Sequence, residues 1–337
     1  MGHTPAVSVL LPVRNGGEYL DEAVASLTGQ TFEDFEVVAV DDGSVDDTLE
    51  RLQAWASRDP RFVVSHQEPA GIVAALEYAR GRARGRYLAR MDADDVTAPE
   101  RLARQFELME TDPELAACGS GIAYFPRDGL RDGTLRYEAW LNGAVTPDEI
   151  ARAIFVECPL AHPTFFLRAE ALTQIGGYRD LGWPEDYDLV LRLWRAGYSL
   201  GKVPDVLHHW RDRPERLSRT HPAYTPAAFL SCKVHHLRAS LLPPHRAAVI
   251  WGAGPVGKTW ARALQAAGST VEAFVELDPR KIGQNIHGAP VLDTHAALER
   301  RGALHLAAVG QPGARDRIVE LLEGAGHRPA EDFVPVA

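Results

Sequence analysis

Short apolar runs alternate with amphipathic stretches along the first 110 residues of the chain. The runs are rich in valine and leucine, which is typical of strands that are buried on both faces of a parallel sheet. The stretches between them repeat apolar residues at helical spacing. We expect strands over residues 7–11, 35–40, 62–65 and 86–91, and helices over residues 18–27, 47–54 and 74–83. This alternation predicts an α/β fold with a mostly parallel sheet between helices.

The middle of the chain is less regular. Residues 116–121 predict a strand that ends in a glycine-rich bend, and residues 127–143 form a polar insertion to which we assign no element. Residues 188–196 have a helical apolar face.

A second alternating pattern follows the break at Pro243-Pro244. It predicts strands over residues 247–251, 271–276 and 304–309, with a helix over residues 258–267. We therefore expect an α/β domain over residues 1–221, a helical connector over residues 222–244, and a small Rossmann-like α/β domain over residues 245–337.

Composition excludes several classes of function. The chain has 337 residues, 45% of them hydrophobic, and a net charge of −10, which argues against a nucleic-acid partner. Its three cysteines lack metal-ligand spacing, so we expect reduced thiols and no zinc site. Neither a basic leader nor a transmembrane segment is apparent. We expect a cytoplasmic protein, or one peripheral to a membrane, and a homo-oligomer is compatible with the sequence.

Three carboxylates lie within four residues at the end of the fourth predicted strand: Asp92, Asp94 and Asp95. Like charges this close repel one another unless a cation lies among them. Mg²⁺ or Mn²⁺ commonly joins such carboxylates to the phosphates of a substrate. The alternative is that Asp95 or Thr97 caps the helix that follows, but a cap accounts for only one acid. The cluster predicts a metal-diphosphate site.

A second acidic turn, Asp41-Asp42-Gly43-Ser44, follows the second predicted strand. Ligands of parallel sheets bind at the carboxyl ends of strands, so we expect these acids at the same edge as the cluster. A plain turn would also select Asp and Gly. Among the arginines that precede the cluster, Arg90 is the best candidate to touch a diphosphate, although a solvated helix end explains most of them.

A third acidic pair, Glu185 and Asp186, lies at the predicted start of a helix, where the backbone dipole favours the ionised form. The alternative is again a helix cap. His162 precedes a proline in the same part of the chain, and a lone histidine is more often structural than a ligand.

These motifs together resemble those of the family 2 inverting glycosyltransferases, which have the GT-A fold. The resemblance is carried, in order, by Val9-Leu10-Leu11-Pro12-Val13-Arg14-Asn15, Val40-Asp41-Asp42-Gly43-Ser44, Met91-Asp92-Ala93-Asp94-Asp95 and Pro99-Glu100-Arg101-Leu102, and later by Trp183-Pro184-Glu185-Asp186. It implies a GT-A-type mixed sheet sandwiched by helices. It also implies a nucleotide-diphospho-sugar donor.

The resemblance implies a role for each matching residue. Donor binding falls on Pro12, Val13, Asp42, Arg90, Asp92 and Asp94, with Asp42 on the nucleotide base and Asp94 as the best candidate for the direct metal ligand. Asp186 becomes the catalytic base, and Glu185 and His162 become acceptor or secondary residues. The family often has an aromatic residue at Arg14, which leaves the nucleotide open. A late histidine on the metal also stays open among His208, His209 and His221.

The second pattern contains a dinucleotide-type fingerprint, with Gly252, Gly254 and Gly257 between a strand and a helix and Asp278 near the end of the next strand. It resembles small nucleotide-binding domains at the start of sugar acyltransferases and nucleotide-sugar epimerases, and ordinary Rossmann units. We expect a nucleotide or NAD there. A purely structural or interaction role and a redox role remain alternatives.

The sequence therefore predicts a metal-dependent, inverting glycosyltransferase that moves a sugar from a nucleotide-diphospho-sugar to a saccharide or other hydroxyl acceptor. The alternatives are a non-catalytic nucleotide sensor or scaffold that works through the C-terminal domain, and a nicotinamide oxidoreductase. The acidic motifs favour the first. The sequence specifies neither the sugar nor the acceptor.

Overall fold

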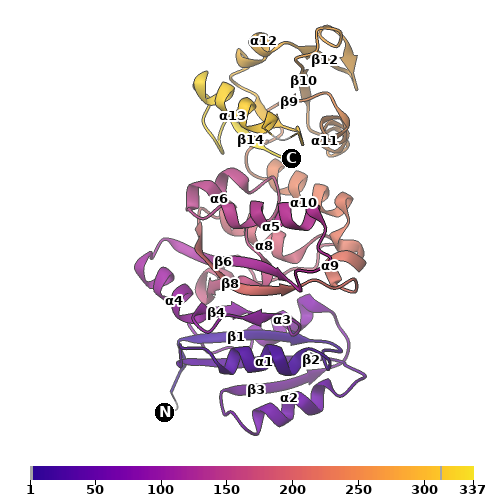
Figure 1. The fold of residues 1–337 in the computed structure, drawn as a ribbon. Helices are drawn as coiled ribbons and strands as arrows, with labels where there is room; N and C mark the ends of the chain where they lie inside the picture. The colour runs from indigo at the N-terminus through magenta and orange to yellow at the C-terminus, as the bar shows by residue number, and fades with distance from the viewer. Residues whose placement is uncertain (1–2, 312) are drawn as a thin grey trace. The chain divides into compact units, whose positions relative to one another are not determined.

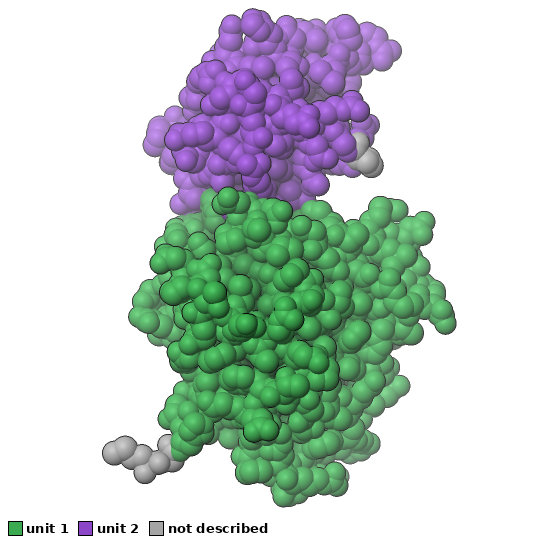
Figure 2. Space-filling view, turned by 60° about the vertical axis from the view of Figure 1, so that its left-hand side comes forward, with its two compact units in different colours: residues 1–150, 159–181, 192–220 green, residues 151–158, 182–191, 221–337 purple. Residues whose placement is uncertain are grey.

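Two compact units make up the chain in the computed structural model, which describes residues 3–311 and 313–337. Unit 1 contains residues 1–150, 159–181 and 192–220, and unit 2 contains residues 151–158, 182–191 and 221–337. Figure 2 distinguishes them by colour. The segments 222–244 and 245–337, which the sequence analysis treats separately, both belong to unit 2, together with two short segments from the middle of the chain.

Unit 1 is built on a mixed, mostly parallel sheet (Figure 1). Its strands are β1 (Val7–Val13), β2 (Phe35–Asp42), β3 (Phe62–Gln67), β4 (Tyr87–Arg90), β5 (Val96–Thr97), β6 (Leu115–Phe125), β7 (Phe166–Arg168) and β8 (Ser199–Arg211), in the order β3-β2-β1-β4-β7-β6-β8-β5. Strands β3 to β4 in that order are parallel, whereas β7 is antiparallel to both of its neighbours and β5 is antiparallel to β8. This confirms the predicted fold class.

Helices cover both faces of this sheet because its central strands are apolar on both sides. They are α1 (Leu20–Thr28), α2 (Thr48–Ala56), α3 (Ile72–Arg80), α4 (Arg101–Thr111), α5 (Asp132–Gly143), α6 (Pro147–Ala153), α7 (Ala169–Gln174) and α9 (Leu217–Thr220), with a 3-10 turn, η1 (His162–Thr164). Alternate residues of β1, including Val9 and Leu11, join Leu20 and Val24 of α1 in one core. Each such side chain contributes roughly 1.5–3 kcal/mol by leaving water.

One expectation for the middle of the chain is wrong. Strand β6 does not end in a glycine-rich bend but runs on through Gly119 and Gly121 to Phe125. A Cβ at Gly121 would lie 2.8 Å from the carbonyl oxygen of Asp205, where the pairing with β8 shifts register. Gly121 is therefore required by close approach of the β8 backbone rather than by a turn. The unassigned insertion contains helix α5.

Unit 2 carries a second sheet in the order β11-β12-β10-β9-β13-β14, in which only the β11–β12 pair is antiparallel among the described strands. Its strands are β9 (Ala248–Trp251), β10 (Val271–Val275), β11 (Asn285–Ile286), β12 (Ala289–Leu292), β13 (Leu304–Ala307) and β14 (Phe333–Pro335). Its helices are α10 (Pro226–Arg238), α11 (Pro255–Ala266), α12 (Thr294–Leu298) and α13 (Ala314–Gly324), with a 3-10 turn, η2 (Pro222–Tyr224), and most of α8 (Glu185–Arg195). No helix in the described part of the chain has the length and apolar character to cross a bilayer.

His305 on β13 is the buried titratable group of this second sheet. Its Nδ1 accepts a hydrogen bond of 2.9 Å from Nε1 of Trp251, and its Nε2 lies 3.2 Å from the carbonyl oxygen of Arg300. Burial, together with the neighbouring His327, lowers the pKa of His305 to about 4. The native state therefore binds fewer protons here than the unfolded chain, whose histidines titrate near about 6.5.

We expect His305 to weaken the fold as pH falls from about 6.5 toward 4, by up to about 3 kcal/mol at the acid end. The stability is fully present above the unfolded pKa and is lost as pH drops through the folded one. The measurement compares urea unfolding of the wild type and His305→Gln between pH 7 and pH 4.5. The gap between the two should shrink as pH falls, and a constant gap would contradict the assignment.

Candidate active site

The carboxyl ends of β1, β2 and β4 form one edge of the sheet in unit 1. Val13 pairs with Asp41 on one side of β1, and Leu10 pairs with Arg90 on the other. Because β2 and β4 flank β1, their ends lie about 10 Å apart. The two acidic turns predicted from the sequence therefore belong to the same edge, on either side of the loop that follows β1.

Pro12 and Val13 end the central strand of this edge. Proline lacks an N–H group and is rare in central strands. The backbone nitrogen of Pro12 points toward β4. The carbonyl of Leu10 accepts a hydrogen bond from the Met91 N–H, and the backbone groups of alternate residues in a strand point the same way. The β4 ladder has already ended at Arg90, so no ladder bond is lost there. A role for Pro12 and Val13 in donor binding stays a prediction.

The loops after β1 and β2 are fixed to one another by side chains. The backbone N–H of Asn15 donates to Oγ of Ser44 (2.8 Å), and the N–H of Val45 donates to Oδ1 of Asn15 (2.9 Å). Gly16 donates to Oγ1 of Thr48. Asn15 has a φ of 51°, a left-handed conformation that asparagine tolerates better than most residues. The edge is therefore built from fixed loops.

Asp42 is more tightly engaged than the sequence indicates. Its Oδ1 accepts hydrogen bonds from the Gln67 side chain (2.7 Å) and the Ala70 N–H (2.8 Å), and its Oδ2 accepts one from the Gly71 N–H (2.9 Å). The residue is only 4% exposed. The carboxylate thus fastens the segment after β3 to the end of β2. A carboxylate can accept about four hydrogen bonds. Asp42 accepts the three named above, so its predicted contact with the nucleotide base depends on the one lone pair that remains.

The cluster after β4 brings three carboxylates together. Oxygen atoms of Asp92, Asp94 and Asp95 all lie within 4.8 Å of one another. The side chain of Asp92 is 28% exposed and that of Asp94 is 15% exposed, whereas that of Asp95 is 1% exposed. An all-oxygen donor set suits Mg²⁺ or Mn²⁺. The two exposed acids are therefore the ones that could bind a metal from solution.

Asp95 supports the other two acids from inside the protein. Its Oδ2 lies 2.9 Å from Nε2 of the buried His208, and its Oδ1 accepts a hydrogen bond from the Arg211 N–H (2.8 Å). Burial, with the charge of Asp94, raises the pKa of Asp95 to about 8. Burial also lowers the pKa of His208 well below its ordinary value. The alternative helix-cap role of Asp95 is wrong, because helix α4 has no side-chain cap.

Arg90 is a buried cation beside the cluster. It is 2% exposed, and its Nη1 forms an ion pair with Oδ1 of Asp92. Its Nε has no hydrogen-bond partner among the described residues. Burial and the nearby acids raise the pKa of Asp92, and Arg90 opposes that shift. The arginine thus stabilises the carboxylate form of Asp92, and a direct contact with diphosphate stays a prediction.

Two further arginines, from the end of β8 and the segment after it, hold Asp94. Nε of Arg213 donates to Oδ2 of Asp94, and Nε of Arg211 donates to its carbonyl oxygen, both at 2.6 Å. Both guanidinium groups also lie over the ring of Tyr19. In this structure, arginine side chains supply the positive charge that the acidic cluster requires.

The third acidic pair lies in unit 2, at the start of helix α8. The hydroxyl of Tyr224 donates to the Glu185 carboxylate at 2.6 and 2.8 Å. Asp188, one turn on, accepts a hydrogen bond from Trp183 and contacts Nε2 of His236 at 3.0 Å. Glu185 and Asp188 are 3% and 1% exposed. Asp186, between them, is half-buried, so it is the acid of this turn with most access to solvent.

Comparison with known proteins decides the family. The profile described as "Glycosyl transferase family 2" matches residues 8–176, half of the chain, including both acidic turns of unit 1. The chain belongs to glycosyl transferase family 2. It is therefore an enzyme of the glycosyltransferase class, with the GT-A fold.

Two relatives of this family 2 glycosyltransferase are named for amylovoran biosynthesis and O-antigen biosynthesis. The amylovoran biosynthesis glycosyltransferase AmsE of Erwinia amylovora is 30% identical over 59% of this chain and 74% of its own length. The O-antigen biosynthesis glycosyltransferase WbnJ of Escherichia coli is 26% identical over 70% of this chain and 89% of its own length.

Solved structures are similar to this glycosyltransferase in fold. TarS 1-349 of S. aureus, in complex with UDP-GlcNAc, superposes with a TM-score of 0.57 at 19% identity, over 69% of this chain and 67% of that one. The mannosyltransferase PcManGT from Pyrobaculum calidifontis, in complex with GDP-Man and Mn²⁺, superposes with a TM-score of 0.50 at 23% identity, over 70% of this chain and 62% of that one.

His162 of this glycosyltransferase is a buried, neutral histidine. Its Nε2 lies 3.3 Å from the Tyr178 hydroxyl, and its ring packs edge-on against Phe165. Burial and the charge of Arg90 lower its pKa well below the ordinary value. The histidine therefore lies within the electrostatic reach of the cluster, and its acceptor role stays a prediction.

In the glycine turn of unit 2, the backbone requires glycine at two of the three predicted positions. Gly252 has a φ of 105°, and a Cβ at Gly257 would lie 1.9 Å from its carbonyl oxygen. A Cβ at Gly254 would meet nothing within 4 Å. The acid that reaches this turn is Glu276, which accepts a hydrogen bond from the Ala253 N–H, whereas Asp278 pairs with Arg280. Glu276 thus takes the place that the spacing predicts for Asp278.

Sequence reasoning missed the partners of the acids. The sequence leaves three histidines as candidates for a metal ligand, and one of them, His208, contacts the buried Asp95. Arg213 and Tyr224 carried no motif at all. The aromatic and basic residues that follow β8 were the only available signal, and spacing alone does not tell which carboxylate each one meets.

We expect removal of Arg213 to strengthen metal binding, because this cation and a metal compete for Asp94. Arg213→Gln should bind free Mn²⁺ about three- to tenfold more tightly in the absence of nucleotide, which corresponds to about 1 kcal/mol for a partly exposed ion pair. Electron paramagnetic resonance of free Mn²⁺ measures the dissociation constant. Arg219→Gln, which removes an arginine that pairs with Asp212 instead, is the control. Equal affinities in both variants would show that Arg213 does not compete with the metal.

Proposed function

We propose that this glycosyltransferase is metal-dependent and inverting, and that it moves a sugar from a nucleotide-diphospho-sugar to a hydroxyl of a saccharide or other acceptor. The observation that carries the proposal is the convergence of Asp92, Asp94 and Asp95 within 4.8 Å at the end of β4. The GDP-Man and Mn²⁺ bound by a structural neighbour support the same reading. Oxygen ligands alone do not separate Mn²⁺ from Mg²⁺.

The donor side of the proposal uses residues of unit 1. Asp94 and Asp92 would hold the metal, which supplies positive charge to the departing diphosphate. Asp95 is held by His208 and Arg211, and the side chain of Arg211 also holds the Asp94 carbonyl. Arg213, which pairs with Asp94, would be available to bind a phosphate oxygen of the donor, since arginine matches phosphate as well as carboxylate. Pro12, Val13 and Asp42 line the edge on which we place the nucleotide.

The acceptor side of the proposal uses Asp186. It takes the proton of the acceptor hydroxyl as that oxygen attacks the anomeric carbon and the bond from that carbon to the diphosphate breaks. One base and one displacement invert the anomeric centre, whereas retention would need a second, covalent step. The half-buried position at the start of α8 supports this role, because the helix dipole favours the ionised acid.

The glycine turn of unit 2 is a second candidate site, for a nucleotide or NAD. The open space at Gly254 supports it, because a ligand phosphate requires that the backbone be approached closely. Glu276 is the acid that would reach a ribose hydroxyl.

We expect Asp94→Ala to abolish metal-dependent turnover of the donor while the protein stays folded. The side chain is at the surface of the cluster, so its loss removes a ligand rather than a core contact. Donor hydrolysis with and without Mn²⁺ measures the effect, and circular dichroism confirms the fold. Turnover at the wild-type rate would remove the metal assignment.

We expect Asp186→Asn to keep donor binding and to lower sugar transfer by about 10²–10⁴-fold, the usual contribution of a general base. The amide is isosteric but cannot accept the proton. Calorimetry of donor binding and a transfer assay separate the two effects. A variant that transfers sugar as fast as the wild type would rule out Asp186 as the base.

A further inference from the structure

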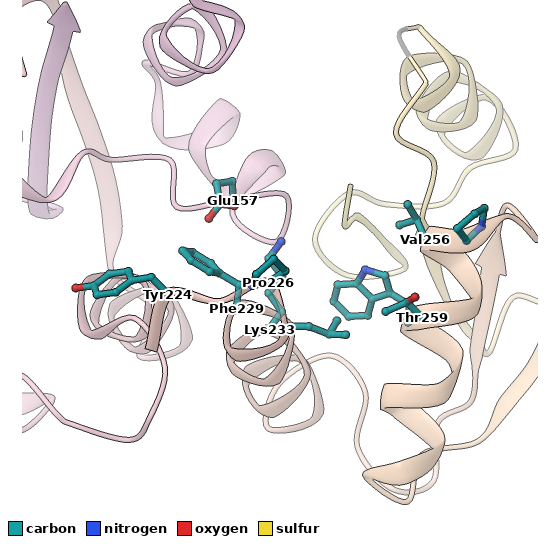
Figure 3. Close-up of a pocket in the computed structure, with 10 residues that line it drawn as sticks. Glu157, Tyr224, Pro226, Phe229, Lys233, Val256 and Thr259 are labelled. Atoms are coloured by element: carbon teal, nitrogen blue, oxygen red, sulfur yellow. The ribbon is translucent and has the colours of Figure 1, made fainter. Parts of the chain in front are cut away.

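A pocket of about 530 Å³ lies in unit 2 between helices α10 and α11 (Figure 3). Its volume is within the range of small-molecule sites, roughly 300–1,000 Å³. Figure 3 shows Phe229 and Lys233 on α10, Val256 and Thr259 on α11, and Glu157 on a third segment. The full lining is Glu157, Tyr224, Pro226, Phe229, Leu230, Lys233, Pro255, Val256, Thr259 and Trp260.

The walls combine aromatic faces with a few polar groups. Phe229, Tyr224 and Trp260 supply rings, and Glu157, Lys233 and Thr259 supply a carboxyl, an amine and a hydroxyl. A saccharide ring has the same two characters, since its C–H face is apolar and its rim carries hydroxyl groups. Sugar rings therefore fit this lining better than a purely apolar chain, which would leave the remaining hydrogen-bonding capacity of the carboxyl and the amine unused.

The polar groups of the pocket are held in place rather than mobile. Oε1 of Glu157 accepts a hydrogen bond of 3.0 Å from the Cys158 N–H, and Nζ of Lys233 donates one of 2.6 Å to the Val156 carbonyl. Burial raises the pKa of Glu157 and lowers that of Lys233, and each group opposes the shift of the other. A fixed carboxyl and amine can read the hydroxyl pattern of a sugar.

One side chain, Tyr224, links the pocket to the turn that carries the proposed base. The ring of Tyr224 lines the pocket, and the hydroxyl of the same side chain donates to Glu185, which precedes Asp186 in the first turn of α8. An occupant of the pocket therefore touches the residue that holds the catalytic turn. The sequence does not indicate that α11 and the turn of Asp186 are linked through Tyr224, because α11 belongs to the predicted C-terminal domain and Asp186 to the predicted N-terminal one.

We infer that this pocket binds the saccharide acceptor, which gives helix α11 and its domain a role in acceptor recognition. The inference rests on the proposed function, in which a saccharide acceptor is the second substrate. It assigns the acceptor to unit 2, on the side of Asp186, and it does not require a nucleotide at the glycine turn.

The test is binding of simple glycosides to the full-length protein. The probes are 4-nitrophenyl α- and β-glycosides of glucose, galactose, N-acetylglucosamine and rhamnose, and saturation-transfer NMR reports their binding. Val256→Trp fills the pocket from an exposed position of α11. Ala266→Trp, at an exposed position of the same helix outside the lining, is the matched control. Glu157→Gln, a conservative change, covers the case in which the tryptophan variant does not fold.

We expect at least one glycoside to bind the wild type and Ala266→Trp equally, with at least tenfold weaker binding to Val256→Trp and a measurable loss in Glu157→Gln. Donor affinity should stay within twofold in all variants. Absence of glycoside binding to the wild type, or equal binding to Val256→Trp and the control, would overturn the inference. If the wild type did not bind the donor, the proposed function would be contradicted. Glycoside binding to the pocket would remain a separate result.

Discussion

Repulsion among three carboxylates at the end of one strand is the constraint on which this active site depends. Asp92, Asp94 and Asp95 are too close to remain charged without compensation. The protein compensates each in a different way. Arg90 is buried against Asp92, Arg213 pairs with Asp94, and Asp95 is buried against a neutral histidine with its pKa raised to about 8. The result is a cluster in which the two partly exposed acids, Asp92 and Asp94, are each paired with an arginine.

This arrangement explains why the site lies where it does in the fold. Loops after β1 and β2 are fixed to one another, and Asp42 fastens the segment after β3, so the edge around the cluster is rigid before any ligand binds. Rigid donors and acceptors cost little reorganisation when charge develops on a leaving group. The residues we assign to the donor belong to unit 1, and the base and the acceptor pocket belong to unit 2.

The sequence predicts most of the strands and all three acidic turns, because both follow local rules of periodicity and strand ends. It does not predict contacts between distant residues. Arg213 is 119 positions from Asp94, and Tyr224 is 39 positions from Glu185. Gly121 looks like a turn residue in isolation, and its true reason, the nearby Asp205 carbonyl, exists only once β8 is paired with β6. Such residues are determined by tertiary packing, which a single sequence does not display.

The most direct test of the central claim is a crystal structure with Mn²⁺ and a nucleoside diphosphate, with the metal located by its anomalous scattering. We predict a manganese peak at the carboxylates of Asp94 and Asp92, with Arg213 moved off Asp94. Manganese bound elsewhere, for example beside Asp188 and His236, or a nucleotide bound with Arg213 still on Asp94 and no metal in the cluster, would contradict it.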